Sequence, residues 1–243
     1  MNARPPVFLR ARWEHLVFLN YEVPRELLEP LVPHGTELDD WNGTFLASLV
    51  GFRFADTRVL GFSVPGHRTF EEVNLRFYVR RRAPDGAVRR GVVFVRELVP
   101  RAAIAWVARS LYNEPYLSVP MHHHTTLDRE RGGRAEYGWT LESSRFALSA
   151  SAAGAAAPLQ PGSEAEFITE HYFGYTRQRD GGTLEYEVEH PRWNVWLAAA
   201  SEFQGPGAKL YGAPFADILA KPARTAYLAL GSEVSVRRGT RLA

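Results

Sequence analysis

The sequence predicts one mainly β domain of the β-rich α+β class, arranged as an antiparallel barrel or a pair of curved sheets with about three short helices. Many segments alternate apolar and polar residues with the two-residue period of a strand, and turn sequences separate them. The alternating strand and helix order of parallel α/β folds is absent. No repeat or compositional break divides the 243 residues, so we expect residues 1–243 to form a single domain.

The first half of the chain predicts four long strands and two helices. The turn 83–86 (APDG) joins two of these strands as a hairpin. Pro24 suits the first turn of a short helix, and Ile104, Val107, Ala108 and Leu111 recur at helical spacing. The predicted strands are 16–22, 45–54, 70–81 and 88–98, and the predicted helices are 25–31 and a segment beginning at 101.

The second half continues as a meander of strands. Ser163 and Glu166 form a capping-box pattern that opens a short helix at 164–169. The turn 179–182 (RDGG) predicts a second hairpin, an amphipathic segment covers 193–203, and a Gly/Pro-rich stretch follows it. The predicted strands are 116–126, 135–143, 145–153, 171–178, 183–190 and 224–237.

Composition narrows the possible partners. The hydrophobic share of 45% is typical of a globular protein. The net charge is only +2, and the basic residues are scattered along the chain rather than gathered on one face, so we expect no nucleic-acid partner. There are no cysteines, no apolar run of membrane-spanning length and no glycine-rich nucleotide loop, so we expect no membrane partner and no cofactor. The expected location is the cytoplasm, and a homo-oligomer is left open.

The predicted strand 70–81 has two chemically opposite faces. Glu72, Asn74, Arg76 and Tyr78 share one face, and apolar residues such as Leu75 share the other. A carboxylate, an amide, a guanidinium and a phenol can satisfy one another or hold a polar ligand without bulk water. This face is therefore either a polar interior or a surface in contact with water, and the pattern does not decide between the two.

Two further polar positions are candidates for a site. Glu97 lies one strand over from Arg76, and with Glu72 it makes a pair of carboxyl groups beside a guanidinium, as an acid or base requires. The alternative is a structural ion-pair network between strands. His190 precedes a proline and is followed by Trp193, so it is placed either at the rim of a pocket or on the surface.

His122 and His124 raise the possibility of a metal site. In a strand these two imidazoles face the same way and can supply two nitrogen ligands. A third and fourth ligand are not evident, although His171, His190 or Glu170 can be considered. We therefore expect no metal, and we keep metal-dependent hydrolysis as a hypothesis that elemental analysis would test.

Several separated motifs resemble a known family. They are WEHLVFLNYEVPRELLEPLVP, FEEVNLRFYV, GVVFVRE followed by VARSLYNEPY, and FITEHYFGY followed by HPRW. In order and spacing they are similar to the YqjF-like family of uncharacterised bacterial proteins, over nearly the whole chain. That family is grouped by fold with acetoacetate decarboxylase, which implies a closed or nearly closed β-barrel or double cone with a central cavity.

The resemblance implies a fold but no reaction. Acetoacetate decarboxylase works through a lysine that forms a Schiff base, and the corresponding place here is similar to 113–116, where Tyr116 cannot form an imine. The lysines of this chain, Lys209 and Lys221, lie beside glycine and proline and are expected to face solvent. We therefore predict that the protein is not a Schiff-base decarboxylase.

Besides metal-dependent hydrolysis, two functions remain as hypotheses. In the first, the barrel binds a small polar or carboxylate-bearing molecule, with Arg76 holding the anion and Asn74, Glu72, Tyr78 and His190 around it. Any chemistry would then be proton transfer or a lyase reaction without a cofactor, with Glu72 or Glu97 as the base and Tyr116 or Tyr78 as the acid. In the second, the barrel is not catalytic, its polar interior satisfies itself, and an outer patch contacts another protein.

Overall fold

A computed structural model describes residues 4–242, apart from the side chains of Val107, Ala108 and Leu111. Within residues 4–242 no helix is both long and apolar enough to cross a bilayer. The strands are β1 (Val7–Glu22), β2 (Glu37–Leu38), β3 (Leu46–Val59), β4 (Phe70–Arg82), β5 (Val88–Val99), β6 (Tyr116–Ser118), β7 (Met121–Thr125), β8 (Gly132–Leu141), β9 (Ser144–Ala153), β10 (Ala157–Pro158), β11 (Phe173–Arg177), β12 (Thr183–Glu189), β13 (Asn194–Leu197), β14 (Ala200–Gln204), β15 (Thr225–Arg237) and β16 (Thr240–Arg241). The helices are α1 (Arg25–Leu28), the 3-10 helix η1 (Glu29–Leu31), α2 (Ala102–Leu111), α3 (Glu164–Thr169), α4 (Ala208–Tyr211) and α5 (Ala213–Leu219).

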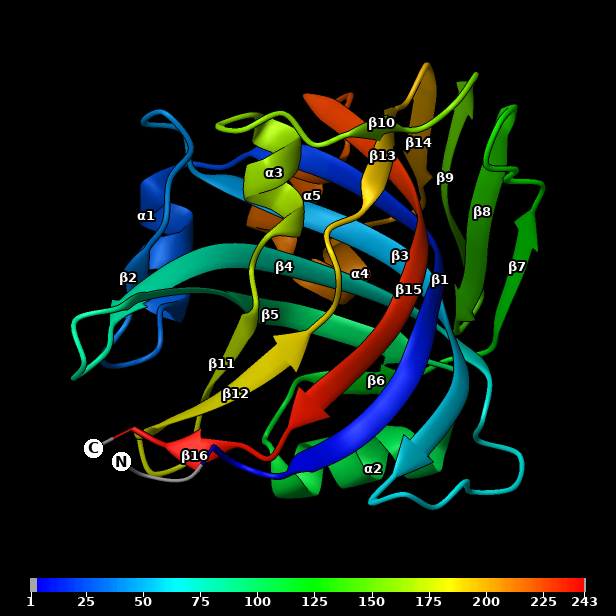
Figure 1. The fold of residues 1–243 in the computed structure, drawn as a ribbon. Helices are drawn as coiled ribbons and strands as arrows, with labels where there is room; N and C mark the ends of the chain where they lie inside the picture. Colours follow the sequence, from blue (N-terminus) through cyan, green and yellow to red (C-terminus); the bar gives the residue numbers. More distant parts are fainter. Residues whose placement is uncertain (1–3, 243) are drawn as a thin grey trace.

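The large sheet curls until its hydrogen-bonded path returns to its start. Neighbouring strands follow the order β15, β1, β3, β4, β5, β11 and β12. β12 then pairs back with β15, where Val188 lies opposite Val236 and Glu189 opposite Ser235. Figure 1 shows these curved strands with α2 below them and a second sheet at the right. The predicted β-rich, barrel-like architecture is confirmed.

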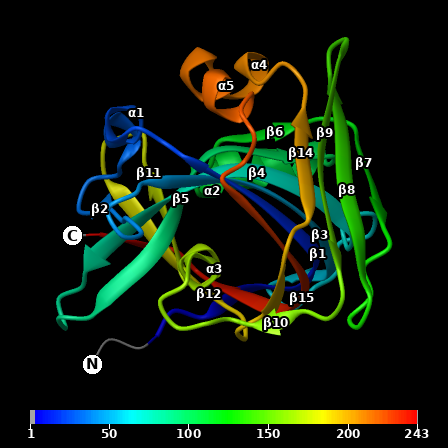
Figure 2. The same cartoon turned by 90° about the horizontal axis from the view of Figure 1, so that it is seen from above.

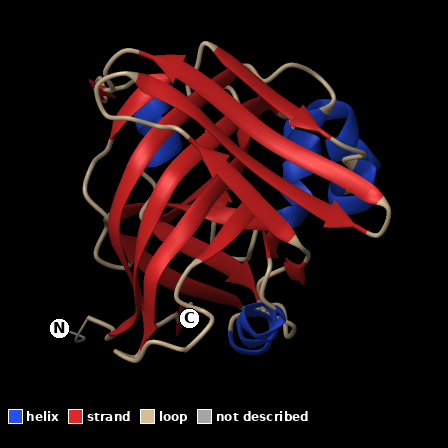
Figure 3. Cartoon of the chain, turned by 90° about the vertical axis from the view of Figure 1, so that its right-hand side faces the viewer, coloured by secondary structure: helices blue, strands red, loops and turns tan. Residues whose placement is uncertain are grey.

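The second sheet packs against the outside of the first. It has the order β14, β9, β8, β7, and it lies to one side of the curled sheet in Figure 2 and across its front in Figure 3. The core between the two sheets contains Leu75 and Phe77 from β4, with Trp139 from β8 and Leu148 from β9. This packing accounts for the apolar face of β4, since Val73, Leu75, Phe77 and Val79 all belong to it.

The opposite face of the curled sheet encloses a second cluster of side chains. Phe18 of β1, together with Val50, Phe52 and Phe54 of β3, belongs to this inner cluster. Because successive residues of a strand point to opposite sides, the residues between those of the outer core must project inward. The polar face of β4 therefore faces the interior of the ring.

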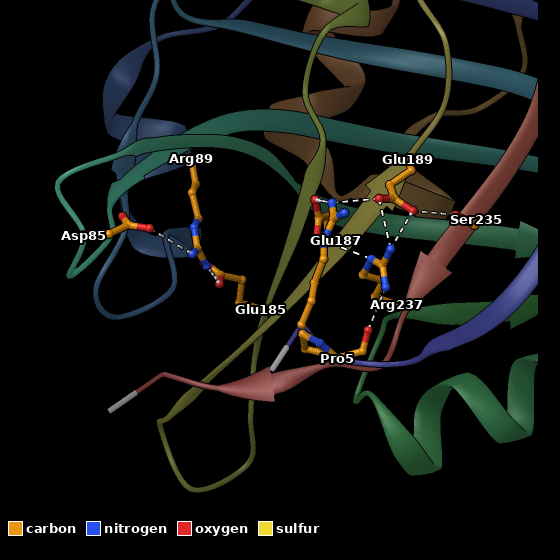
Figure 4. Close-up of polar contacts among 9 residues, drawn as sticks. Pro5, Asp85, Arg89, Glu185, Glu187, Glu189, Ser235 and Arg237 are labelled. Carbon is orange, nitrogen blue, oxygen red and sulfur yellow. Dashed lines mark hydrogen bonds and ion pairs between the residues drawn. The ribbon is translucent and has the colours of Figure 1, made fainter. Parts of the chain in front are cut away.

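Ion pairs hold the β11–β12 hairpin at its two borders, as Figure 4 shows. At the border with β15, Ser235 donates a hydrogen bond of 2.8 Å to Glu189, and Arg237 Nη2 lies 3.2 Å from the same carboxylate. Arg237 also donates to the backbone oxygen of Pro5 at 2.9 Å. At the other border, Arg89 of β5 lies 2.5 Å from Glu185. The contacts with β15 hold the sheet closed on itself, and the contact with β5 fixes the other border of the hairpin.

Three details differ from the sequence prediction. β5 pairs in parallel with both β11 and β6, so the sheet is mixed rather than fully antiparallel. The Gly/Pro-rich stretch contains α4 and α5, which are too short for helical periodicity to be read from the sequence. The amphipathic segment 193–203 forms β13 and β14. The serine half of the predicted capping box is present, because Ser163 Oγ accepts a hydrogen bond from Glu166 N at 3.1 Å, whereas the Glu166 carboxylate accepts from Gly162 N at 2.7 Å instead of from Ser163 N.

Gly231 marks a point where two backbones approach too closely for a side chain. Its φ is +87°, and a Cβ added there would lie 1.9 Å from the Trp13 oxygen. We expect Gly231→Ala to lower the free energy of unfolding by about 3 kcal/mol, measured by denaturant titration. Gly86→Ala is the control, since its φ of +84° is similar but nothing lies within 4 Å. Equal losses in the two variants would contradict this explanation.

Candidate functional site

A cavity of about 390 Å³ lies inside the ring of strands. Alternation along β4 places Glu72, Asn74 and Arg76 on its wall, and Glu97 of β5 joins them because it is paired with Asn74 across the two strands. Most of the remaining lining is apolar. The predicted site residues that line the cavity are Glu72, Asn74, Arg76, Glu97, Tyr116 and His190.

Arg76 is held with part of its guanidinium unpaired. Its Nη2 donates a hydrogen bond of 3.1 Å to the backbone oxygen of Ile168. The guanidinium carbon lies 5.6 Å from the ring centre of Phe18 and 5.7 Å from that of Tyr78, which are cation–π distances. Its Nε is buried and has no hydrogen-bond partner among residues 4–242. The site therefore holds an oriented cation with a free donor.

Glu72 is a buried carboxylate that accepts two hydrogen bonds. Asn74 Nδ2 donates to Oε1 at 3.1 Å, and the Tyr116 hydroxyl donates to Oε2 at 3.0 Å. Burial nevertheless raises the pKa of Glu72 to about 7, against the lowering effect of the two donors. Near neutral pH this side chain can therefore both accept and release a proton.

Glu97 and Glu114 complete a cluster of three buried carboxyl groups. Burial, and then the charges of Glu114 and Glu72, raise the pKa of Glu97 well above its ordinary value. Burial also raises the pKa of Glu114 to about 7, although this group accepts hydrogen bonds from Thr176 at 2.5 Å and Tyr186 at 3.0 Å. The raised pKa of Glu97 favours its protonated form, and because the three groups are coupled they titrate as a cluster rather than one by one.

Six polar atoms of cavity-lining residues are buried without a hydrogen-bond partner within residues 4–242, and three of them are Trp13 Nε1, Thr57 Oγ1 and His171 Nδ1. The three on β4 and β5 are Arg76 Nε, Asn74 Oδ1 and Glu97 Oε2. Buried polar atoms are nearly always paired, so unpaired ones require an explanation. All three residues line the same cavity, and they lie on the paired strands β4 and β5. The enclosed polar groups of β4 and β5 thus include one unpaired donor, on Arg76, and unpaired oxygens on Asn74 and Glu97.

His190 forms part of the cavity wall. Its ring stacks on Trp193 with 4.1 Å between the ring centres, and it lies 4.9 Å from the ring of Tyr172. Burial lowers the pKa of His190 to about 4, so the imidazole is neutral at physiological pH. Its Nδ1 lies 2.9 Å from the Pro191 oxygen. The residue therefore supplies an aromatic surface rather than a charge.

An aromatic wall, formed by Trp13, Phe52, Phe54, Phe70 and Trp193, makes up much of the remaining lining. Its rings are in contact from one to the next. The ring centres of Phe54 and Phe70 are 4.7 Å apart, and those of Phe52 and Trp13 are 5.1 Å apart. Trp13 lies 6.2 Å from Trp193. The cavity thus combines a polar region on β4, β5 and β6 with a continuous aromatic surface.

Tyr78 is the one predicted site residue that does not line the cavity. It is on the same face of β4 as Arg76, but its hydroxyl lies 2.5 Å from Ser48 Oγ. Ser48 in turn donates to Asn20 at 2.6 Å. The hydroxyl of Tyr78 is therefore used in a buried chain of polar groups, and the ring of Tyr78 supports the guanidinium.

The histidines and lysines considered for other chemistry lie elsewhere. His122 and His124 are exposed on β7, whereas His123 between them lies 2.7 Å from Glu71. In the described part of the chain no three His, Asp or Glu side chains are arranged to hold a metal ion. Lys209 and Lys221 are exposed and do not line the cavity. The expectation that both lysines face solvent is confirmed.

Sequence reasoning missed several cavity residues. Glu114 lies two positions before Tyr116. In an extended chain, side chains two residues apart point the same way, so this spacing could have identified Glu114 as a neighbour of Tyr116 in the cavity. Tyr186 and His171 come from distant segments, and nothing local indicates that they meet β4. His171 lies 3.4 Å from Asp39, and burial lowers its pKa to about 4.

Comparison with solved structures identifies the fold. The chain superposes on the enduracididine biosynthesis enzyme MppR complexed with pyruvate, with a TM-score of 0.67, 13% identity, and coverage of 100% of this chain and 92% of that one. It superposes on acetoacetate decarboxylase from Legionella pneumophila with a TM-score of 0.62, 14% identity, and the same two coverages. These likenesses establish an acetoacetate-decarboxylase-like fold.

Comparison of sequences identifies the family. The chain is 28% identical over 200 residues to the uncharacterized protein YqjF of Bacillus subtilis (strain 168), covering 79% of this chain and 76% of that protein. The family model DUF2071, an uncharacterized conserved protein, matches residues 10–233. This match covers most of the chain, and the chain therefore belongs to the DUF2071 family.

Proposed function

We propose that this protein binds a small carboxylic acid bearing a carbonyl group in its cavity, and that the neighbouring carboxyl cluster transfers a proton to and from it. The observation that carries the proposal is the set of three unpaired buried atoms, Arg76 Nε, Asn74 Oδ1 and Glu97 Oε2. The volume of about 390 Å³ is within the range of about 300 to 1,000 Å³ that small-molecule sites occupy.

Arg76 is the group suited to hold the carboxylate. A planar guanidinium binds a carboxylate through two parallel hydrogen bonds, and Nε is still free to make one of them. None of the ion pairs within 4.0 Å that residues 4–242 form includes Arg76. A ligand carboxylate would thus meet a cation that no protein carboxylate already neutralises at contact distance.

Within the carboxyl cluster, Glu72 is suited to act as the base and Glu97 as the acid. Glu72 accepts hydrogen bonds from Asn74 and Tyr116, which favours its ionised form and suits it to take a proton from the carbon beside the carbonyl. The raised pKa of Glu97 favours its protonated form, which can donate a hydrogen bond to the carbonyl oxygen as it becomes an enolate oxygen. The proton then returns from Glu72 to carbon. Tyr116 orients Glu72 in this scheme.

We choose pyruvate as the first test ligand because it is found with a protein of the same fold. MppR is described in complex with pyruvate, a small acid with an adjacent carbonyl group. At 13% identity the likeness concerns the fold alone, so pyruvate serves as a first test molecule rather than an assigned substrate.

The alternative is a non-catalytic barrel whose polar interior satisfies itself. The hydrogen bonds of Glu72 and Glu114 to neighbouring side chains favour this view in part. The three unpaired atoms and the unfilled volume beside Arg76 argue against it, because a self-satisfied interior would have neither.

We expect the protein to exchange the methyl protons of pyruvate with deuterium from solvent, as followed by proton NMR. Glu72→Gln should slow this exchange by about 100-fold, the lower end of what a general base contributes. Glu202→Gln is the matched control, since Glu202 is exposed on β14 and does not line the cavity. Exchange that is absent from the unaltered protein, or unaffected by Glu72→Gln, would refute the proton-transfer role.

We also expect borohydride to trap no pyruvate adduct on the protein. The two lysines, Lys209 and Lys221, are exposed and lie outside the cavity lining, so no lysine amine within residues 4–242 is available to form an imine beside Arg76. Intact-mass spectrometry after reduction is the measurement. A pyruvate-derived mass increase located on either lysine by peptide mapping would overturn the expectation.

A further inference from the structure

We propose that the ligand carries an apolar tail, which extends from the carboxylate at Arg76 along the aromatic wall to the mouth of the cavity beside Phe62 and Val64. The expected class is an amphipathic carboxylic acid with an alkyl or aryl chain rather than pyruvate alone. This inference rests on the proposed function, because it takes Arg76 as the position of the carboxylate.

The aromatic wall is larger than a small polar acid requires. Pyruvate has a single methyl group to place against a lining that contains Trp13, Phe52, Phe54, Phe70 and Trp193. An apolar surface that faces only water in a binding cavity contributes nothing to affinity for a polar ligand, whereas covering it with a hydrocarbon is favourable. The chemistry of the wall therefore matches a hydrocarbon chain.

The mouth of the cavity is also apolar. Phe62 and Val64 lie in the loop between β3 and β4, line the cavity, and are 76% and 47% exposed. Ala103 and Ile104 of α2 line it as well. By contrast, Glu72 and Glu97 are 3% and 2% exposed. The enclosed end of the cavity is therefore polar and its open end is apolar. An entrance for a polar solute would be expected to have polar residues at the open end.

The distance between the two ends sets the size of the tail. Phe70, which follows the mouth loop, and Arg76 are six residues apart on β4, or about 20 Å at roughly 3.3 Å per residue. A ligand that touches both ends needs a chain much longer than that of pyruvate. Acids of about six to ten carbon atoms, or phenyl-substituted acids, cover part of this span and extend along the aromatic wall toward the mouth, whereas pyruvate leaves nearly the whole wall uncovered.

The test is a series of straight-chain acids from propanoate to decanoate, titrated calorimetrically below the concentrations at which they form micelles. We expect the affinity to rise about fourfold for each added methylene group until the chain reaches the mouth. 3-Phenylpropanoate should bind at least about tenfold more tightly than propanoate, because its ring covers the aromatic wall. Affinities that do not change with chain length would overturn the inference.

Two substitutions in the loop between β3 and β4 test where the apolar tail of the ligand lies. Phe62→Ser should weaken the binding of decanoate by a few-fold and leave that of propanoate unchanged, because only the long chain extends toward the mouth. Leu60→Ser is the matched control, since Leu60 is 66% exposed in this loop but does not line the cavity. Equal losses for both variants, or none for either, would contradict the proposed path.

Failure of the apolar tail and failure of the carboxylate site at Arg76 give different binding results. If propanoate and pyruvate bind in a manner that depends on Arg76 while longer acids bind no better, the carboxylate site stands and the tail is refuted. If hexylamine binds as tightly as hexanoate and neither depends on Arg76, the carboxylate site itself is refuted and the inference falls with it.

Discussion

Replacing Arg76 with leucine is expected to weaken the binding of pyruvate by about 100-fold while the protein stays folded. Removing one partner of a desolvated charge pair costs about 2 to 5 kcal/mol of binding free energy, which corresponds to this range. Leucine is apolar and can keep contact with the rings of Phe18 and Tyr78, which now flank the guanidinium. Isothermal titration calorimetry measures the affinity, and circular dichroism reports on the fold.

Two further variants make this result specific to the cavity. Arg76→Lys keeps the charge but loses the planar pair of donors, so its affinity should lie between those of the unaltered protein and Arg76→Leu. Arg58→Leu removes the same charge from an exposed position of β3 outside the cavity lining, and it should bind as the unaltered protein does. Unchanged binding by a folded Arg76→Leu variant would show that the ligand lies elsewhere.

Replacing Glu97 with glutamine is expected to stabilise the protein at alkaline pH. The pKa of Glu97 is raised in the folded chain, so this group contributes stability that is complete below the unfolded value of about 4.5 and is lost as pH rises through the folded pKa. Glutamine resembles the protonated form at every pH. Glu97→Gln should therefore be more stable than the unaltered protein at alkaline pH, and the difference should grow as pH rises through the folded pKa of Glu97.

Denaturant titrations across the pH range test this expectation. Near pH ~5 the unaltered protein and Glu97→Gln should differ by less than about 1 kcal/mol, because Glu97 is then protonated in the folded state. Glu202→Gln removes an exposed carboxyl group and should show no such trend. A pH-independent difference between Glu97→Gln and the unaltered protein would mean that Glu97 does not hold its proton in the folded chain.

The parts of the site that could be predicted are those set by local periodicity. Strand alternation placed Glu72, Asn74 and Arg76 on one face, and the turn 83–86 placed Glu97 beside them on the next strand. Whether that face was enclosed depended on two contacts between distant segments. One is the pairing of β12 with β15, and the other is the packing of the second sheet on the opposite face of β4.

The parts that could not be predicted depend on how strands meet in space. Glu114, Tyr186 and the aromatic wall come from separate elements, and their proximity to Glu97 follows only from the closed order of the strands. Tyr78 points to the same side of β4 as Arg76, but it lies two residues farther along the strand. There its hydroxyl is hydrogen-bonded to Ser48 and does not line the cavity. Alternation determines the face of a strand, but not how far along that face a cavity extends.

A crystal structure with 3-(4-bromophenyl)propanoate tests the central claim most directly, because the anomalous signal of bromine locates one end of the ligand. The account predicts the carboxylate at hydrogen-bond distance from Arg76, about 2.7 to 3.0 Å, and the bromine against the aromatic wall on the side of Phe62. A bromine peak on the outer surface, or a carboxylate turned away from Arg76, would contradict it.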